Sequence, residues 1–344
     1  MTDSALQHAL RLVARGLPLS RQEAAAAFRA LMRGQATPVQ SAALLFGLRA
    51  RGERPEELAG AADALRGEMV AVEAHEPHRL VDTCGTGGGA VTTLNLSTAA
   101  AFVVAGAGVP VAKHGNRSFT SRSGSADVLE ALGVGIDLVP RRCAEVLKET
   151  GLVFLFAPNF HPAMRHVAAA RRELAVPTIM NLLGPLVNPA GARRQVVGVA
   201  DLDRGPLVAE ALTLLGALRA MVVHADVGMD EVSPGGITTV WEVREGAVQE
   251  WRLDPEHLGW ASSRLDGLAG GTPAENAARI EALLEGGGTE EERNAVLLNA
   301  AAAIAVSDDA THIGGAAQRA RAALEQGGAA RVLRELRRAA PRQG

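Results

Sequence analysis

Hydrophobic residues recur every three to four positions through the first part of the chain, with polar residues between them, and this spacing predicts helices. Three of these helices have recognisable starts. Ser20 is followed three residues later by Glu23, which is a capping box, while Pro38 and Pro55 stand where proline is favoured in a first helical turn. Residues 1–75 are therefore predicted to form an all-α domain of about four helices.

The pattern changes at Arg79, where short β-rich apolar runs begin to alternate with helical patterns. Alternation of this kind predicts a largely parallel sheet covered by helices on both faces. Ligands of such sheets bind beyond the carboxyl ends of the strands. The runs expected as strands are residues 79–82, 109–115, 134–139, 152–158, 194–200 and 220–226.

Residues 238–253 alternate between apolar and polar with a period of two around Glu245-Gly246, which predicts a β-hairpin at a sheet edge. The tail from Thr272 has a helical pattern with breaks at 285–288 and 307–315.

The predicted fold class is therefore α/β, with a small N-terminal helical domain and a larger domain that contains a mostly parallel central sheet. We place the helical domain at residues 1–75 and the α/β domain at residues 76–344. The helical stretch at about 160–190 could pack with either part, and we predict that it joins the N-terminal domain.

Composition and charge narrow the class of function. The 344 residues are 47% hydrophobic, and they carry a net charge of −3 with scattered basic residues. Nucleic-acid binding requires concentrated positive charge, and a membrane span requires about 18 consecutive apolar residues, so neither partner is expected. The start of the chain lacks the apolar core of a secretory signal, and Cys84 and Cys143 are too few for a disulfide framework. We expect a cytoplasmic protein that acts on small molecules.

A glycine-rich loop follows the first predicted strand. Residues 85–90, Gly-Thr-Gly-Gly-Gly-Ala, match the glycine pattern of dinucleotide-binding folds, but the next helix starts only near Ser97 and the next strand ends in Lys113 instead of an acidic residue. A nicotinamide cofactor is therefore disfavoured. Two interpretations of the glycines stay open: a cradle of backbone amides for a phosphorylated ligand, or a tight strand–helix turn capped by Ser97.

A second polar run follows the next strand within twenty residues. Side chains with hydrogen-bond donors crowd the thirteen positions from Lys113 to Ser125, a density that is costly to bury unless a ligand binds it, although a solvated loop could have the same composition. Lys113 is one of only two lysines among 35 basic residues, which indicates that a compact point charge is needed there. Together the two runs predict a phosphate-binding site.

Asp230 and Glu231 lie just beyond the apolar strand at 220–226. Adjacent acidic residues are usually solvated surface charge. At the carboxyl end of a strand that faces phosphate-binding loops, however, two carboxylates suit Mg²⁺, which takes a few carboxylates and completes its coordination with phosphate oxygens and water. We therefore predict a magnesium site at this pair.

These runs, together with "APNFHPAMRHVAAARREL" at 157–174 and "NLLGPLVNPA" at 181–190, closely resemble the anthranilate phosphoribosyltransferases over nearly the whole chain. The resemblance implies the fold of the class III phosphoribosyltransferases and nucleoside phosphorylases. It also implies transfer of the phosphoribosyl group from 5-phosphoribosyl 1-diphosphate (PRPP) to the amino nitrogen of anthranilate, the second step of tryptophan biosynthesis. Two Mg²⁺ ions and a homodimer formed through the helical domain are implied as well.

The resemblance also assigns roles to individual residues. It implies Ser97, Asp230 and Glu231 as magnesium ligands. Anthranilate contacts would come from Gly85, Asn116 and Arg171, with His114 and Pro185 close by, and the catalytic residues would be Lys113, Asn116 and Arg171. The residues implied for PRPP are Gly85, Gly88, Gly89, Thr93, Asn95, Leu96, Ser97, Thr98, Lys113, His114, Gly115, Asn116, Arg117, Ser118, Phe119, Thr120, Ser121 and Ser125.

General chemistry agrees with these roles. A guanidinium binds a carboxylate through two parallel hydrogen bonds, which suits Arg171 to anthranilate, whereas the alternative for Arg171 is a surface salt bridge on an amphipathic helix. An aryl amine is already nucleophilic, so no strong general base is required. Mg²⁺ and Lys113 would neutralise the charge that develops on the departing diphosphate while the ribose becomes cation-like.

The chain departs from the family pattern at two places. Gly89 and Ala90 stand where an aspartate and a glycine are usual, and Ala175 and Pro177 replace a glycine and an arginine. We hypothesise that the missing acid at position 89 weakens PRPP binding while turnover is kept.

Two other functions fit parts of the pattern. Pyrimidine nucleoside phosphorylases share the implied fold and also act at a ribose C1, but their lysine-bearing loop differs from "KHGNR" at 113–117. A non-catalytic relative that binds nucleic acid is disfavoured by the acidic charge balance and by the Asp230-Glu231 pair, and we expect no salt-sensitive retention on DNA.

Overall fold

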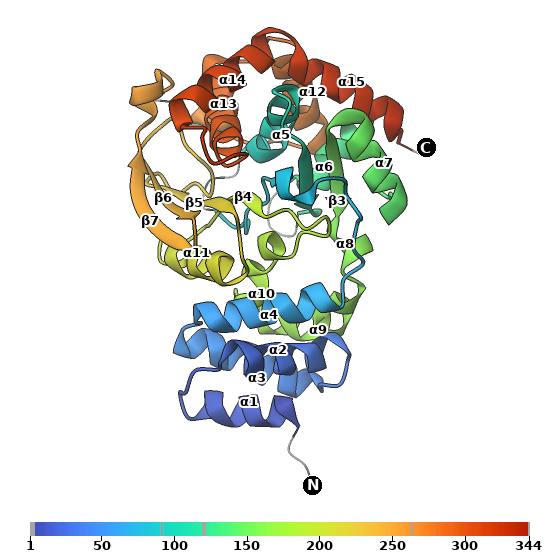
Figure 1. Ribbon diagram of the computed structural model, residues 1–344, viewed down its shortest axis with the longest axis vertical. Helices are drawn as coiled ribbons and strands as arrows, with labels where there is room; N and C mark the ends of the chain where they lie inside the picture. Colours follow the sequence, from blue (N-terminus) through green and yellow to red (C-terminus); the bar gives the residue numbers. More distant parts are fainter. Residues whose placement is uncertain (1–3, 90, 92, 119–121, 263, 343–344) are drawn as a thin grey trace.

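The computed structural model describes residues 4–89, 91, 93–118, 122–262 and 264–342 (Figure 1). Helices form the end of the molecule that carries the N-terminus, as predicted. The Ser20 hydroxyl accepts the Glu23 main-chain N–H, and the Glu23 carboxylate accepts the Ser20 N–H, which confirms the capping box. The four helices are α1 (Ala5–Ala14), α2 (Arg21–Met32), α3 (Pro38–Arg51) and α4 (Pro55–Gly67).

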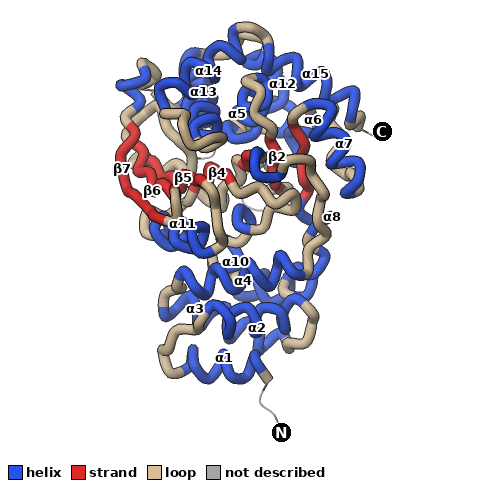
Figure 2. Tube along the Cα trace, in the orientation of Figure 1, coloured by secondary structure: helices blue, strands red, loops and turns tan. Residues whose placement is uncertain are grey.

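Two short helices from the middle of the chain, α9 (Ala168–Leu174) and α10 (Ile179–Leu182), lie beside the N-terminal helices, whereas α8 (Ala157–Phe160) lies next to β3 (Leu152–Phe156) (Figure 1). Figure 2 shows the same arrangement for α8 and α10. The buried side chains of Val167 and Ile179 belong to the same hydrophobic core as Phe28 of α2. Arg66 of α4 also donates to the Leu186 carbonyl at 2.8 Å. The boundary that we placed between residues 75 and 76 stays a prediction.

The sheet has the strand order β3-β2-β1-β4-β5-β6-β7, in which β1 to β5 are parallel and β6 runs antiparallel to both β5 and β7. The β6–β7 hairpin lies at the edge, and Glu245 and Gly246 take the positive φ values of a tight turn, as the alternating pattern predicts. The strands are β1 (Val81–Asp82), β2 (Val111–Gly115), β3 (Leu152–Phe156), β4 (Arg194–Gly198), β5 (Arg219–Ala225), β6 (Thr238–Arg244) and β7 (Ala247–Leu253).

The expectation of a strand at 134–139 is wrong. Val134 forms only an isolated bridge to Pro341, and this segment belongs to no strand of the sheet. Its apolar residues Val134 and Ile136 are buried in the core as a connection between two helices, so burial and not strand pairing explains their apolar character.

Alternate residues of the central strands face two different cores. Val196 and Met221 pack into the core on one face of the sheet, whereas their neighbours Val197 and Val222 pack into the core that continues into the N-terminal helices. The second face is covered by α11 (Arg204–Leu214) (Figure 1). Helices of the remaining chain gather on the first face: α5 (Leu96–Gly106), α6 (Ser125–Ala131), α7 (Pro140–Thr150), α12 (Pro273–Leu284), α13 (Glu290–Ala305), α14 (Ile313–Glu325) and α15 (Gly328–Ala339).

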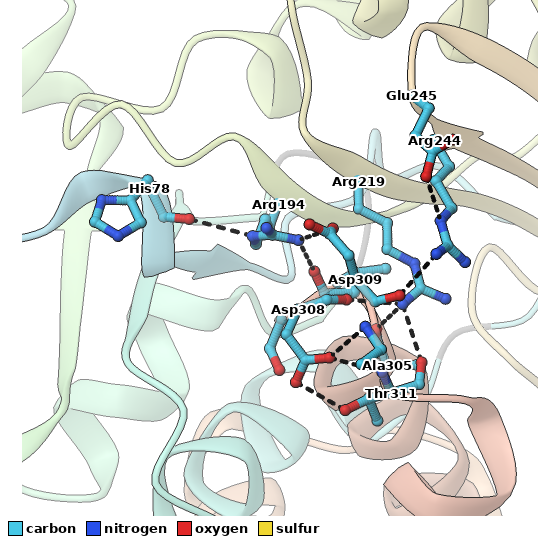
Figure 3. Close-up of polar contacts among 12 residues, drawn as sticks. His78, Arg194, Arg219, Arg244, Glu245, Ala305, Asp308, Asp309 and Thr311 are labelled. Atoms are coloured by element: carbon cyan, nitrogen blue, oxygen red, sulfur yellow. Dashed lines mark hydrogen bonds and ion pairs between the residues drawn. The ribbon is translucent and has the colours of Figure 1, made fainter.

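Two arginines at the amino ends of β4 and β5 hold the loop that follows α13 (Figure 3). Arg219 donates to the carbonyls of Ala305, Asp308 and Thr311 at 2.6, 2.8 and 3.0 Å. Arg194 donates to the Asp309 carboxylate at 3.0 Å. The amino edge of the sheet is therefore closed by structural contacts, which leaves the carboxyl edge for a ligand.

No helix in the described part of the chain is long and apolar enough to cross a membrane.

Candidate active site

A cleft of about 1060 Å³ lies at the carboxyl ends of β1, β2, β4 and β5. Its other wall comes from the N-terminal helices and the short helices beside them, through Arg49, Leu65 and Arg171. The cleft therefore lies where helical domain and sheet meet, at the edge where parallel sheets bind ligands.

Most of the predicted site residues line this cleft. Leu96 does not, because its side chain is buried in the core, and the predicted contacts Phe119, Thr120 and Ser121 lie outside the described residues. Residues that line the cleft are Gly85, Gly88, Gly89, Thr93, Asn95, Ser97, Thr98, Lys113, His114, Gly115, Asn116, Arg117, Ser118, Ser125, Arg171, Asp230 and Glu231.

The glycine loop runs directly from β1 along the end of β4. Thr86 donates its main-chain N–H to the Gly198 carbonyl at 2.9 Å. Gly88 has a φ of +89°, a backbone conformation that would be strained for any residue with a side chain. Gly89 lies against the acid pair, because its N–H hydrogen-bonds to Asp230 and an added Cβ would lie 2.5 Å from Asp230 Oδ1. An aspartate at position 89 therefore requires the Asp230 side chain to move.

Lys113 is a buried cation between the glycine loop and the polar run that follows β2. Its Nζ donates to the Thr83 carbonyl at 3.1 Å, to the Thr83 hydroxyl at 3.1 Å and to the Ser97 hydroxyl at 3.2 Å. Burial lowers the pKa of Lys113, while the nearby Cys84, Asp82 and Glu231 act in the opposite direction. The ammonium therefore joins the β1 loop, β2 and the start of α5.

The acid pair lies half-buried beside that cation. The Glu231 carboxylate accepts the Thr93 hydroxyl at 2.7 Å and the Ser97 N–H at 3.0 Å. Burial, followed by the adjacent Asp230, raises the pKa of Glu231 to about 7, and burial also raises the pKa of Asp230. Two carboxylates in a poorly solvated position favour a bound cation, because it would relieve their repulsion.

The oxygen donors at this place fit Mg²⁺ and not a metal held wholly by protein. In the described part of the chain, no three His, Cys, Asp or Glu side chains gather around one point. Asp230, Glu231 and the Ser97 hydroxyl are hard oxygen donors, and Mg²⁺ commonly takes its other ligands from phosphate and water.

Two buried histidines stand farther along the cleft. The rings of His114 and His161 have centroids 5.0 Å apart, and His114 Nδ1 lies 2.9 Å from the Gly184 carbonyl. His114 Nε2 and both ring nitrogens of His161 have no partner within hydrogen-bonding geometry among the described residues. Burial lowers the pKa of His114 to about 4 and that of His161 to about 3, so both rings are neutral at pH 7.

Arg171 lines the same end of the cleft from α9. No carboxylate of the described residues lies within ion-pair distance of its guanidinium, and burial lowers its pKa. The alternative of a surface salt bridge is therefore wrong for the residues that the structure describes. A half-buried guanidinium that faces a cleft without a counter-charge suits an anionic ligand.

Arg117 differs from the other predicted contacts. It lines the cleft, but its guanidinium pairs with Asp127 at 2.8 Å and Glu130 at 2.6 Å, and it stacks over the Phe156 ring. Its charge is therefore balanced by the protein, and the contact with PRPP stays a prediction.

Sequence reasoning missed several residues of the cleft. Thr83 lies between the first predicted strand and the glycine loop, and His161 lies inside the quoted stretch at 157–174. Nothing in the pattern shows that Thr83 holds Lys113 or that the His161 nitrogens lack partners among the described residues. Arg49 and Arg204 come from α3 and α11, whose local patterns are those of ordinary amphipathic helices, so no local signal marks them. Pro185 is buried behind the cleft wall and does not line it.

Comparison with known proteins agrees with this geometry. Residues 77–330 match the family model described as glycosyl transferase family, a/b domain, and residues 7–69 match its helical bundle domain. Curated relatives called anthranilate phosphoribosyltransferase include one from Thermomicrobium roseum, 49% identical over 95% of both chains, and one from Rubrobacter xylanophilus, 49% identical over 98% of both chains.

Solved structures give the same result. The anthranilate phosphoribosyltransferase of Thermus thermophilus superposes with a TM-score of 0.90 at 44% identity, over 96% of this chain and 99% of that one. The enzyme of Saccharomyces cerevisiae, solved in complex with PRPP and Mg, superposes with a TM-score of 0.88 at 28% identity, over 98% of both chains. With its two matched domains and full-length relatives, the chain belongs to the anthranilate phosphoribosyltransferase family.

Proposed function

We propose that this protein transfers the phosphoribosyl group of PRPP to the amino nitrogen of anthranilate, giving N-(5-phosphoribosyl)anthranilate and diphosphate. This is the second step of tryptophan biosynthesis from chorismate. The observation that carries the proposal is one cleft with a half-buried acid pair and a buried lysine at one end and a guanidinium without a carboxylate partner at the other. Such a cleft can hold a diphosphate and a carboxylate at the same time.

The sheet end of the cleft is the place for PRPP. The glycine loop offers main-chain N–H groups, and Thr93, Asn95, Thr98 and the other predicted contacts add polar side chains. Asp230, Glu231 and the Ser97 hydroxyl would hold Mg²⁺, and we propose two ions. When bound, Mg²⁺ neutralises negative charge on the diphosphate.

The helical end of the cleft is the place for anthranilate. Arg171 would bind the carboxylate, and Asn116 follows β2 on the wall between the two ends. The neutral imidazoles of His114 and His161 would contact the aromatic ring and the amine without placing a positive charge near the developing ribose cation.

The reaction forms a bond between the amine nitrogen and ribose C1 and breaks the bond between C1 and the diphosphate oxygen. The nitrogen lone pair supplies the new bond, the departing diphosphate takes the electrons of the broken one, and the proton that the amine loses passes to the diphosphate or to water. Lys113 lies where it can stabilise the departing charge. The aryl amine needs no strong base, so positioning and charge stabilisation supply the catalysis.

We also propose a homodimer in the cytoplasm. Val39 and Phe46 are 78% and 53% exposed, and they lie seven residues apart on α3 and so on one face of that helix. Two large apolar side chains on one helix face support self-association through the helical domain.

Loss of anthranilate fluorescence in the presence of PRPP and Mg²⁺ tests the function. We expect metal-dependent loss with the wild-type protein and none with the Asp230→Asn, Glu231→Gln double variant. Absence of any loss at all substrate concentrations would overturn the proposal, whereas full activity of the double variant would overturn the assignment of the acid pair.

A further inference from the structure

The central strand β1 is too short to pair with the whole of β2. Val81 pairs with Val111, and the ladder between these two strands goes no further. Val111 donates its N–H to Gly151 on the β3 side, so the peptide groups of Ala112 and His114 face the β1 side. Beyond the end of β1, some of these groups need another partner in a fully buried place.

Two side chains supply those partners. Asp82 Oδ1 accepts the His114 main-chain N–H at 3.1 Å. Asn188 donates its Nδ2 to the Ala112 carbonyl at 2.8 Å and to Asp82 Oδ2 at 2.7 Å, and its Oδ1 accepts the Ala190 N–H at 2.9 Å. A carboxylate and an amide thus replace the missing rungs between β1 and β2.

This arrangement is costly, because both side chains are buried. Asp82 is 0% exposed and Asn188 is 4% exposed, and neither lines the cleft. Burial raises the pKa of Asp82 to about 6, while the Asn188 hydrogen bond and the charge of Lys113 act in the opposite direction. Because burying a carboxylate is unfavourable and Asp82 lies outside the cleft, we infer that its function is to hold the protein groups to which it is hydrogen-bonded.

The two residues lie where the segment that leads into the glycine loop diverges from the segment that carries Lys113 and Asn116. Asp82 is followed by Thr83, which accepts Lys113 twice and leads into the glycine loop. His114, which Asp82 binds, lies between Lys113 and Asn116. We propose that Asp82 and Asn188 are positioning residues that set the separation of the glycine loop from Lys113 and Asn116, and with it the distance between the two reactants. This inference rests on the proposed transfer reaction.

Asp82→Asn tests the inference. Its amide must turn an NH₂ group toward either the His114 N–H or the Asn188 NH₂, so one contact becomes donor against donor. We expect kcat to fall roughly tenfold to hundredfold, because small misplacements of reactants have effects of that size. The Kd of each substrate alone, measured by calorimetry, is expected to change less than about threefold, because each wall of the cleft is intact.

Adding Asn188→Asp to Asp82→Asn restores a donor and an acceptor between positions 82 and 188 but removes the donor to the Ala112 carbonyl, so we expect no recovery of kcat. Should Asp82→Asn fail to fold, Asn188→Ser is the milder variant, with a smaller expected loss of kcat. A kcat within twofold of wild type in the folded Asp82→Asn or Asn188→Ser protein would overturn the inference.

Thr150→Val is the matched control. Thr150 is also buried, and its hydroxyl makes several hydrogen bonds at the other end of β3, remote from the cleft. We expect this variant to lower Tm and leave kcat unchanged, so a loss of kcat here would show that general destabilisation explains the effect. Wild-type protein that transfers no phosphoribosyl group would contradict the proposed function instead, so the two failures can be told apart.

Discussion

The environment of Arg171 indicates a ligand more directly than that of any other charged side chain assigned to the site. Its guanidinium lines the cleft, is partly desolvated, and has no carboxylate within ion-pair distance among the described residues. Lys113, by contrast, gives its three protons to Thr83 and Ser97, and Arg117 is paired with Asp127 and Glu130. Arg171 is therefore free to bind an anionic ligand, whereas Lys113 would act in the proposed reaction from a position fixed by Thr83 and Ser97.

Replacement of Arg171 by methionine is expected to raise KM for anthranilate roughly 10- to 100-fold, because a charged hydrogen bond to the carboxylate is worth about 1.5–3 kcal/mol. KM for PRPP should stay within about twofold. Steady-state kinetics on both substrates provides the measurement. Arg172→Met is the control, because the neighbouring Arg172 is exposed and lines no part of the cleft. Equal effects on both substrates would contradict a role in anthranilate binding.

Substitutions of Gly89 test the hypothesis that the missing acid at this position weakens PRPP binding. Gly89→Asp should lower KM for PRPP with kcat kept, provided that Asp230 moves away from the new side chain, whose Cβ would otherwise lie 2.5 Å from Asp230 Oδ1. Gly89→Ala brings the same Cβ without a charge and is expected to raise that KM or leave it unchanged. An unchanged KM for PRPP in Gly89→Asp would show that the hypothesis is wrong.

At the scale of elements, α13 depends on an arginine that comes from β5. Helix C-termini leave carbonyl groups without partners, and Arg219 donates to the Ala305 carbonyl at the end of α13 and to two carbonyls of the following loop (Figure 3). Its Nη2 also lies 2.8 Å from Glu242 of β6. One buried guanidinium thus joins the sheet to a central helix.

Arg219→Met is expected to destabilise the protein by about 3–5 kcal/mol, because it leaves buried acceptors and Glu242 without their donor. Urea unfolding measures this change. The exposed pair Arg252–Asp226 is the control, and Arg252→Met should change stability by less than about 1 kcal/mol. Activity of the folded Arg219→Met protein should be unchanged, because Arg219 lies at the opposite edge of the sheet. A stability loss no larger than that of Arg252→Met would contradict this role.

At the scale of the whole molecule, the buried histidines make stability depend on pH. Burial lowers the pKa of His161 to about 3 from an ordinary value of 6.5. Below pH 6.5 the unfolded chain therefore binds a proton that the folded protein does not, and stability falls as the pH falls toward 3. His114, with a pKa of about 4, acts in the same direction, whereas the raised pKa values of Asp82 and Glu231 act in the opposite one.

The difference between wild type and His161→Gln isolates one histidine from these opposing groups. Between pH 7.5 and pH 5.0 the wild type should lose about 2 kcal/mol more stability than the variant. Urea unfolding at the two pH values measures the difference. Equal losses in the two proteins would show that His161 is not held neutral by the fold.

The proposed homodimer predicts a mass of two chains in light scattering. Phe46→Glu places a charge on the exposed apolar face of α3 and is expected to give a folded monomer, because an unpaired charge is costly to bury in an interface. Val139→Glu is the control, because Val139 is also exposed and apolar but precedes α7 on the α/β part. A wild-type monomer would contradict the dimer.

Local order was readable from the sequence by itself. The spacing of apolar residues predicted the N-terminal helices, the parallel strands and the edge hairpin, and the Ser20–Glu23 spacing predicted a capping box, because each depends on neighbours within a few residues. The grouping of polar residues directly after strands also predicted most of the cleft, since parallel strands bring their carboxyl ends to one edge.

Only the tertiary structure decided which polar groups are paired. Asp82 and Asn188 meet across more than one hundred positions, Arg171 faces the cleft without a carboxylate, and Val134 and Ile136 are buried outside any strand. These outcomes depend on which distant segments pack together and how much water they exclude, and the free energy of a polar side chain depends on that burial and on its partner. A local pattern therefore indicates where chemistry occurs in this protein, while packing determines which residues bind and which hold the others in place.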